Sequence, residues 1–374
     1  MNGRTPAEVF PPGEFIRDEI EARGWTQTDF AEILGRPFRL VNEIISGKRA
    51  ITPETAFGLG EALGTGPQFW MNLESSYRLS LVEREDTSVA QRAKLYAMAP
   101  IKDMVKRGWI DPPEDTHHLE LQLLHFFEID SIDEVPNLRA AARKSTSYAE
   151  TSASQVAWLY RAKQLASALE VPAFEEGSLI QVFDKIRKLI HVEHGERRVS
   201  RLLGDNGIRF VVVEHLSKTK LDGAAFWLDD HSPVVALSLR FDRIDAFWHT
   251  LVHELAHIHN RDGASLDDNL ISDGASTVRE LSEIERKADE FACNLLVPKD
   301  EIESFIARTR PYYSKASINK FANRIHVNNG IILGQLQRRG EIKYSQNREM
   351  LVKIRDEVTK STLTDGWNTR SEVS

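Results

Sequence analysis

The sequence predicts a mainly α-helical protein with a small α+β part toward its C-terminal end. Residues 11–80 divide into short apolar stretches of helical period separated by Gly and Pro, which indicates a five-helix domain. Residues 83–200 show helical periodicity without strand signals. Runs rich in β-branched and aromatic residues begin only after Gly204, directly ahead of a long apolar helix. We therefore expect four parts: residues 1–82, 83–200, 201–345 and a polar C-terminal tail, 346–374.

The composition is that of an ordinary globular protein, and it limits the partners. The chain has 374 residues, of which 41% are hydrophobic and 28% charged. A net charge of -8 gives no whole-chain attraction to nucleic acid, so DNA contact requires a local basic patch. The single cysteine, Cys293, favours a reducing compartment. Because no signal peptide and no apolar run of about 20 residues is found, we expect a cytoplasmic protein without membrane contact.

Near the N-terminus, the punctuation predicts two short helices joined by a tight turn. After a first helix over residues 14–23, Thr26 is a good N-cap, and Asp29 completes a variant capping box. The helix that Thr26 opens extends to about residue 34, and the next covers residues 37–47. Two such helices separated by a Gly-containing turn are typical of a helix-turn-helix.

Basic residues surround the second of these helices and predict a DNA contact. We expect Arg39 and Asn42 to contact bases, because Arg reads guanine and Asn reads adenine through paired hydrogen bonds. The flanking cations would bind phosphates and set the position of the backbone. They are Arg36, Lys48 and Arg49. The competing interpretation is a helical bundle with a solvated basic edge.

Four segments within residues 10–80 carry a family resemblance. They are Pro-Gly-Glu-Phe-Ile, Gly-Trp-Thr-Gln-Thr, Ser-Gly-Lys-Arg-Ala-Ile-Thr-Pro-Glu-Thr-Ala and Ala-Leu-Gly-Thr…Phe-Trp-Met-Asn-Leu. The region resembles the HigA-type antitoxin branch of the Cro/CI (XRE) helix-turn-helix family. This resemblance implies a transcriptional regulator of a toxin–antitoxin system that binds a double-stranded operator, and it makes a homodimer an expectation. Pro37-Phe38 departs from the polar residues usual there, which leaves the operator sequence open.

In the remainder of the chain, the sequence predicts a linker at residues 83–86 and three strands. The strands are expected at residues 208–213, 224–228 and 234–239, and the last two form a hairpin. The small sheet would offer an edge strand to an extended peptide. Helices over residues 318–339 would cover the core, and the polar end of the chain would fray.

An H-E-x-x-H motif, His253-Glu254-Leu-Ala-His257, lies in the apolar helix that follows the hairpin. Histidines four residues apart share one face of a helix, so both can bind one zinc ion. Glu254 could then reach a water molecule as general base. A catalytic zinc ion needs a third protein ligand. The acids downstream that could supply it are Asp262, Asp267, Asp268, Asp273, Glu280, Glu283 and Glu285.

The helix that begins near Glu285 extends the motif into a second family resemblance. Its residues are Glu285-Arg-Lys-Ala-Asp289-Glu-Phe-Ala-Cys-Asn-Leu-Leu-Val-Pro298, and matching segments upstream are Gly-Ala-Ala-Phe-Trp, Ser-Leu-Arg and Asp-Ala-Phe-Trp. Residues 200–300 thus resemble the ImmA/IrrE family of gluzincin-type metallopeptidases. This resemblance implies a zinc endopeptidase with His253, His257 and Glu285 as metal ligands and Glu254 as base.

Further expectations follow from this resemblance. Asp289 would hydrogen-bond a ligand histidine, while His249 would be structural. A His₂Glu set suits several divalent ions, so manganese stays open beside zinc. Relatives of this type cleave regulators, which implies a protein substrate or partner, repressor-like or toxin-like. The alternative is a latent site, in which case the protein is a non-proteolytic repressor or antitoxin that senses a ligand or partner.

Overall fold

The computed structural model describes residues 9–81, 88–134, 152–217, 219–262, 265–268 and 283–367, with the backbone alone for residues 265–268. The chain divides into two compact units between Thr87 and Ser88. The expected linker at residues 83–86 lies outside the described residues. In the part of the chain that is described, no helix combines the length and the apolar character needed to span a membrane.

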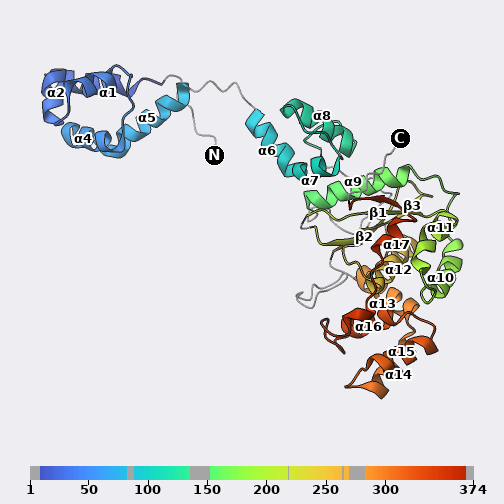
Figure 1. Ribbon diagram of the computed structural model, residues 1–374. Helices are drawn as coiled ribbons and strands as arrows, with labels where there is room; N and C mark the ends of the chain where they lie inside the picture. The colour runs from blue at the N-terminus through green and yellow to red at the C-terminus, as the bar shows by residue number, and fades with distance from the viewer. Residues whose placement is uncertain are drawn as a thin grey trace. The chain divides into compact units, whose positions relative to one another are not determined.

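The described residues of the N-terminal unit form five helices, as the sequence predicts. Figure 1 labels α1, α2, α4 and α5 among them. The capping box at α2 is present, with the Thr26 and Asp29 side chains each accepting from the other residue's backbone N–H. Phe30 and Trp70 are fully buried at the centre of this unit. The helices are α1 (Pro12–Ala22), α2 (Gln27–Ile33), α3 (Phe38–Ile45), α4 (Pro53–Leu63) and α5 (Pro67–Leu81).

A five-stranded mixed sheet forms the centre of the second unit, with strand order β4-β2-β3-β1-β5. The expected hairpin is confirmed, because β2 and β3 pair antiparallel with Ala225 opposite Val235. β1 lies parallel to β3 and β5, and β4 pairs antiparallel with β2. The strands are β1 (Arg209–Val213), β2 (Leu221–Trp227), β3 (Pro233–Leu237), β4 (Ser265–Asp268) and β5 (Leu363–Asp365).

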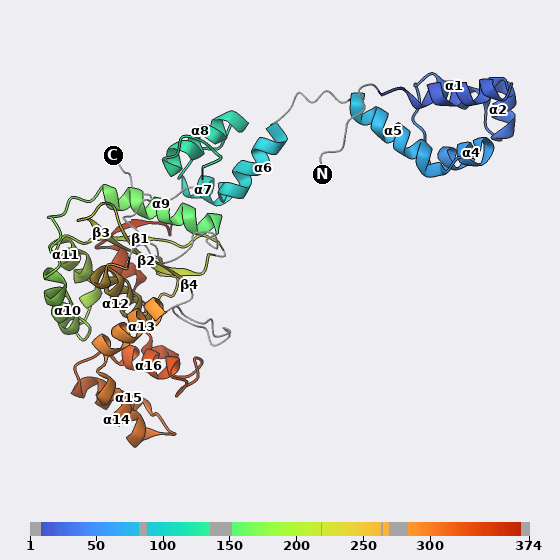
Figure 2. The same cartoon turned by 180° about the vertical axis from the view of Figure 1, so that it is seen from behind.

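Helices cover both faces of this sheet, in three layers (Figures 1 and 2). One face packs on α12 (Ile244–Asn260) through alternate strand residues such as Ala225 and Trp227, and α13 (Glu283–Leu296) packs on α12. The outer helices of this layer are α10 (Ser178–Leu189), α11 (Val199–Gly204), α14 (Lys299–Thr309), α15 (Lys315–Arg324), α16 (Asn329–Arg338) and α17 (Arg355–Thr359). The expected helices over residues 318–339 do contribute to this core.

The opposite face of the sheet packs on helices from the stretch that the sequence sets apart as residues 83–200. Ala224 and Phe226 point into this second core, together with Trp158 of α9. These helices belong to the same compact unit as the sheet. The physical reason is that β2 and β3 are buried at every residue, and a sheet buried on both faces requires two covering layers. The helices are α6 (Ser88–Met98), α7 (Ile101–Arg107), α8 (Thr116–Phe127) and α9 (Ala153–Ser167).

One expectation about the end of the chain is wrong. The end of the chain does not fray at residues 363–365, which form β5 and pair with β1. Asp365, only 3% exposed, accepts hydrogen bonds from Arg107, Trp109 and Arg161, and these partners hold the polar strand in place. Among the described residues, β4 and β5 are the edge strands of the sheet, and the hairpin lies inside it, with β4 beside β2 and β1 beside β3 (Figure 2).

Candidate metal centre and DNA-binding surface

Helix α12 carries the H-E-x-x-H motif into the core of the second unit. Its apolar side chains, including Phe247 and Leu251, pack between the sheet and α13, and the helix ends at Arg261 in a left-handed conformation. His253, Glu254 and His257 are 0% exposed. Three polar side chains in such a place require partners, because an unsatisfied buried polar group costs about 1–3 kcal/mol.

Helix α13 brings Glu285 to the two histidines. Nε2 of His253 and Nε2 of His257 lie 3.1 Å apart, and Oε2 of Glu285 lies 3.2 Å and 3.6 Å from them. A tetrahedral zinc ion with bonds of about 2.0–2.1 Å holds its ligand atoms roughly 3.3–3.4 Å apart. The three measured separations lie on both sides of that value, so this side-chain group has the atom types and spacing to hold one zinc ion.

The ring of His257 is oriented by an acid that sequence reasoning offered only as a competing ligand. Nδ1 of His257 lies 3.1 Å from Oδ2 of Asp262. With its proton on Nδ1, the ring donates to Asp262 and turns the Nε2 lone pair toward His253 and Glu285. The signal in the sequence is the position of Asp262 just after the end of α12.

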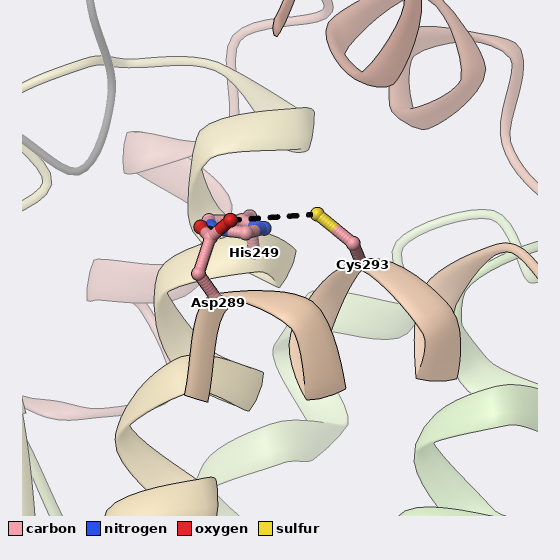
Figure 3. A group of neighbouring side chains, drawn as sticks. All are labelled: His249, Asp289 and Cys293. Atoms are coloured by element: carbon pink, nitrogen blue, oxygen red, sulfur yellow. Dashed lines mark hydrogen bonds and ion pairs between the residues drawn. The ribbon is translucent and has the colours of Figure 1, made fainter. Parts of the chain in front are cut away.

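Asp289, expected beside a ligand histidine, contacts a different group. Its Oδ1 lies 3.0 Å from Nε2 of His249, and its Oδ2 is 4.0 Å from Sγ of Cys293 (Figure 3). Oδ1 also accepts from Arg338. Burial acts to raise the pKa of Asp289, but the contact with His249 and the charge of Arg338 outweigh it and hold the pKa well below its usual range. Sequence reasoning did not identify Arg338, which comes from α16.

The other acids that the sequence offers as a third ligand are placed as follows. Glu283 is exposed and forms an ion pair of 2.9 Å with Lys287. Asp267 and Asp268 belong to β4, and Asp273 and Glu280 lie outside the described residues.

Strand β2 passes directly beside the general-base candidate. A Cβ atom at Gly223 would lie 2.4 Å from Oε1 of Glu254 and 2.8 Å from Cγ2 of Thr250. Only glycine therefore lets the strand approach the carboxylate this closely. This contact explains the glycine at the head of the Gly-Ala-Ala-Phe-Trp segment.

In the N-terminal unit, the predicted DNA contacts lie on and around α3. All five side chains are exposed: Arg36, Arg39, Asn42, Lys48 and Arg49. Glu43 forms ion pairs with Arg39 at 2.9 Å and Arg49 at 3.3 Å. The hydrogen bond from Arg39 lowers the pKa of Glu43. Nδ2 of Asn42 donates to Oε1 of Gln27 at 3.2 Å, so the first residue of α2, which the sequence analysis missed, adjoins this surface.

This fold and this site define a class of protein: a helix-turn-helix domain and an H-E-x-x-H domain in one chain. The comparisons with known families agree. The helix-turn-helix family matches residues 16–70, and the IrrE N-terminal-like domain family matches residues 209–336. The chain therefore belongs to the XRE-type helix-turn-helix regulators by its N-terminal domain and carries an IrrE/ImmA-like domain behind it, which confirms the two family resemblances.

Among proteins, this chain is similar to the HTH-type transcriptional regulator YddM of Escherichia coli (strain K12). The two are 30% identical over 83 residues, which is 22% of this chain and 86% of that protein. Virulence-associated protein I of Dichelobacter nodosus is 30% identical over 88 residues, or 23% of this chain and 82% of that one.

Among solved structures, an addiction module antidote protein of the HigA family from Coxiella burnetii is 33% identical. That match covers 19% of this chain and 79% of that one, with a TM-score of 0.19. PA4674 of Pseudomonas aeruginosa, in complex with its operator DNA, is 30% identical, with 23% of this chain and 94% of that one covered and a TM-score of 0.21.

Proposed function

We propose that this protein is a DNA-binding, antitoxin-like transcriptional regulator that also carries a zinc-dependent endopeptidase acting on a regulator or partner protein. The observation that carries the proposal is the convergence of three ligand atoms, from His253, His257 and Glu285, within 3.6 Å of one another. Glu254 follows the first of these ligands in the same buried helix turn.

The residues around this centre have distinct tasks in peptide hydrolysis. His253, His257 and Glu285 would hold the metal, and a bound zinc ion supplies Lewis-acid chemistry that polarises a carbonyl and lowers the pKa of water. Glu254 takes the proton from the attacking water and returns it to the leaving amine. Asp262 would keep the proton of His257 on Nδ1, so that the lone pair of Nε2 is directed at the metal position.

Helix α3 would provide DNA recognition. The side chain of Arg39 is 89% exposed, so it can leave Glu43 and reach a guanine edge at little desolvation cost. Asn42 would read a neighbouring base, and Lys48 and Arg49 would neutralise phosphates. Such modules often bind palindromic sites as dimers, so the proposed partner is double-stranded operator DNA bound by a homodimer.

A Glu254→Gln variant tests the peptidase. The purified wild-type protein and the variant should each contain one zinc ion per chain, because the amide replaces the base and leaves the three ligands intact. Mass spectrometry of cells expressing either form should find a cleaved partner protein only with the wild type. Glu283→Gln, a change in an exposed acid of α13, is the matched control and should cleave normally.

A second function is favoured by one observation. β4 pairs with β2 alongside Gly223, so the strand edge nearest Glu254 is occupied by the chain itself. Under this alternative, the IrrE-like domain senses a ligand or partner without cutting, and the protein is a non-proteolytic repressor or antitoxin. Glu254→Gln would then leave regulation in cells unchanged, whereas under the first proposal regulation fails.

A further inference from the structure

A second group of potential metal ligands, drawn in Figure 3, lies one helix turn from the proposed metal centre. His249, Asp289 and Cys293 each offer one ligand atom, and these atoms lie within 4.8 Å of one another. His249 precedes the ligand His253 by one turn of α12, and Asp289 follows the ligand Glu285 by one turn of α13. By residue type alone, this group would suit a second zinc ion.

A cation of the chain already fills the position between His249 and Asp289. Nη1 of Arg338, from α16, contacts both Nε2 of His249 and Oδ1 of Asp289. A guanidinium group has donors only, so Oδ1 of Asp289 accepts from Arg338. The positive charge of Arg338 therefore lies against Nε2 of His249 and Oδ1 of Asp289, where a second metal ion would have to bind.

Helix α16 contacts both α12 and α13, at successive helical turns. A Cβ at Gly334 would lie 2.4 Å from Oδ2 of Asp245, so α16 and the start of α12 are in close contact there. One turn further along both helices, Arg338 contacts His249. Nε2 of Gln335 donates to the Cys293 carbonyl oxygen of α13 at 2.7 Å. The next turn of α12 beyond His249 carries His253.

We propose that Arg338 is a positioning residue for the metal centre: bound by His249 and Asp289, it fixes the register of α13 on α12 and so holds Glu285 at ligand distance from His253 and His257. The inference rests on the proposed metal centre and adds a residue that positions its third ligand. Its second consequence is that the His249 group binds no metal ion, since Arg338 supplies the positive charge there.

Zinc affinity and stoichiometry test this proposal. The wild-type protein should bind one zinc ion. Arg338→Met and Asp289→Asn should each weaken zinc binding about 10-fold or more, the size found for groups that orient metal ligands. The double variant should lose little more than either single variant, because both remove the same contact. The absorption spectrum of the cobalt-substituted protein should change in each, since the third ligand shifts.

The control is Arg324→Met, which removes an arginine of α15 that pairs with Glu301 at the surface. Zinc affinity and the cobalt spectrum should stay as in the wild type. Cooperative urea unfolding shows which variants fold. If Arg338→Met does not fold, the near-isosteric Asp289→Asn still tests the proposal.

Two results would overturn the proposal. One is wild-type zinc affinity and an unchanged cobalt spectrum in folded Asp289→Asn. The other is two zinc ions per wild-type chain, the second lost in Cys293→Ser, which would make the group a metal site. If the protein binds zinc as expected but cleaves no peptide, the proposed peptidase function fails, whereas the proposed role of Arg338 in zinc binding does not. A wild-type protein that binds no zinc would refute the proposed metal centre itself.

Discussion

Replacing Gly223 with alanine should disturb the proposed catalytic base and leave the metal ligands in place. The added methyl would lie 2.4 Å from Oε1 of Glu254 and 2.8 Å from Cγ2 of Thr250. Favourable contacts with carbon begin at about 3.5 Å. The carboxylate must therefore retreat by roughly 1 Å, or β2 must move away from α12.

The expected size of the effect follows from this overlap. Overpacking of a core costs about 1–3 kcal/mol, and the stiffer unfolded chain of an alanine variant offsets about 0.4–1 kcal/mol of that cost. Gly223→Ala should thus lower the free energy of unfolding by up to about 2.6 kcal/mol. A displacement of about 1 Å at a reacting group can reduce a rate by about 100-fold.

Three measurements on one protein preparation check this prediction. Urea unfolding gives the stability, zinc titration should give near-wild-type affinity, and cleavage of the partner found with the Glu254 variant should slow. Gly204→Ala is the matched control, because its new methyl would meet only Val171 at 3.8 Å and should not destabilise. A Gly223→Ala protein with wild-type stability and cleavage would refute the close approach of β2 to Glu254.

Four further outcomes are expected. Asp262→Asn should weaken zinc binding about 10–100-fold in a chelator competition, because His257 loses the acceptor that fixes its tautomer. Asp365→Ala should cost about 3–5 kcal/mol in urea unfolding, since its buried carboxylate joins β5 to two arginines. In the metal-free protein, burial lowers the pKa of His249 from 6.5 to about 3. As the pH falls below 6.5, His249 is therefore protonated in the unfolded chain but stays neutral in the folded one. Stability should then drop by up to about 1.4 kcal/mol per pH unit, a slope that His249→Gln reduces. Lys48→Ala should reduce the slope of log K against log salt concentration for operator binding by about 0.9.

The local elements were predictable because their signals are local. Thr26 and Asp29 three residues apart form the predicted capping box, and the period of the apolar residues around His253 and His257 identified α12. The hairpin of β2 and β3 was likewise readable from two β-branched runs around a short turn.

The arrangement of distant segments was not predictable in the same way. The residues next to Asp365 in the chain do not indicate that Arg107 and Arg161 form ion pairs with its carboxylate. The polar end was therefore expected to fray, whereas it forms β5. Similarly, the amphipathic pattern of α9 predicts that one of its faces is buried. Only the folded structure shows that this face packs on the sheet.

The sequence by itself determined the two families, the helix-turn-helix and the side chains proposed to hold and use a metal, because spacing along a helix decides which residues share a face. The tertiary structure alone decided that Asp289 contacts His249 and that Arg338 joins them. Those contacts join α12, α13 and α16, and their geometry depends on how whole helices pack, which residue spacing does not encode.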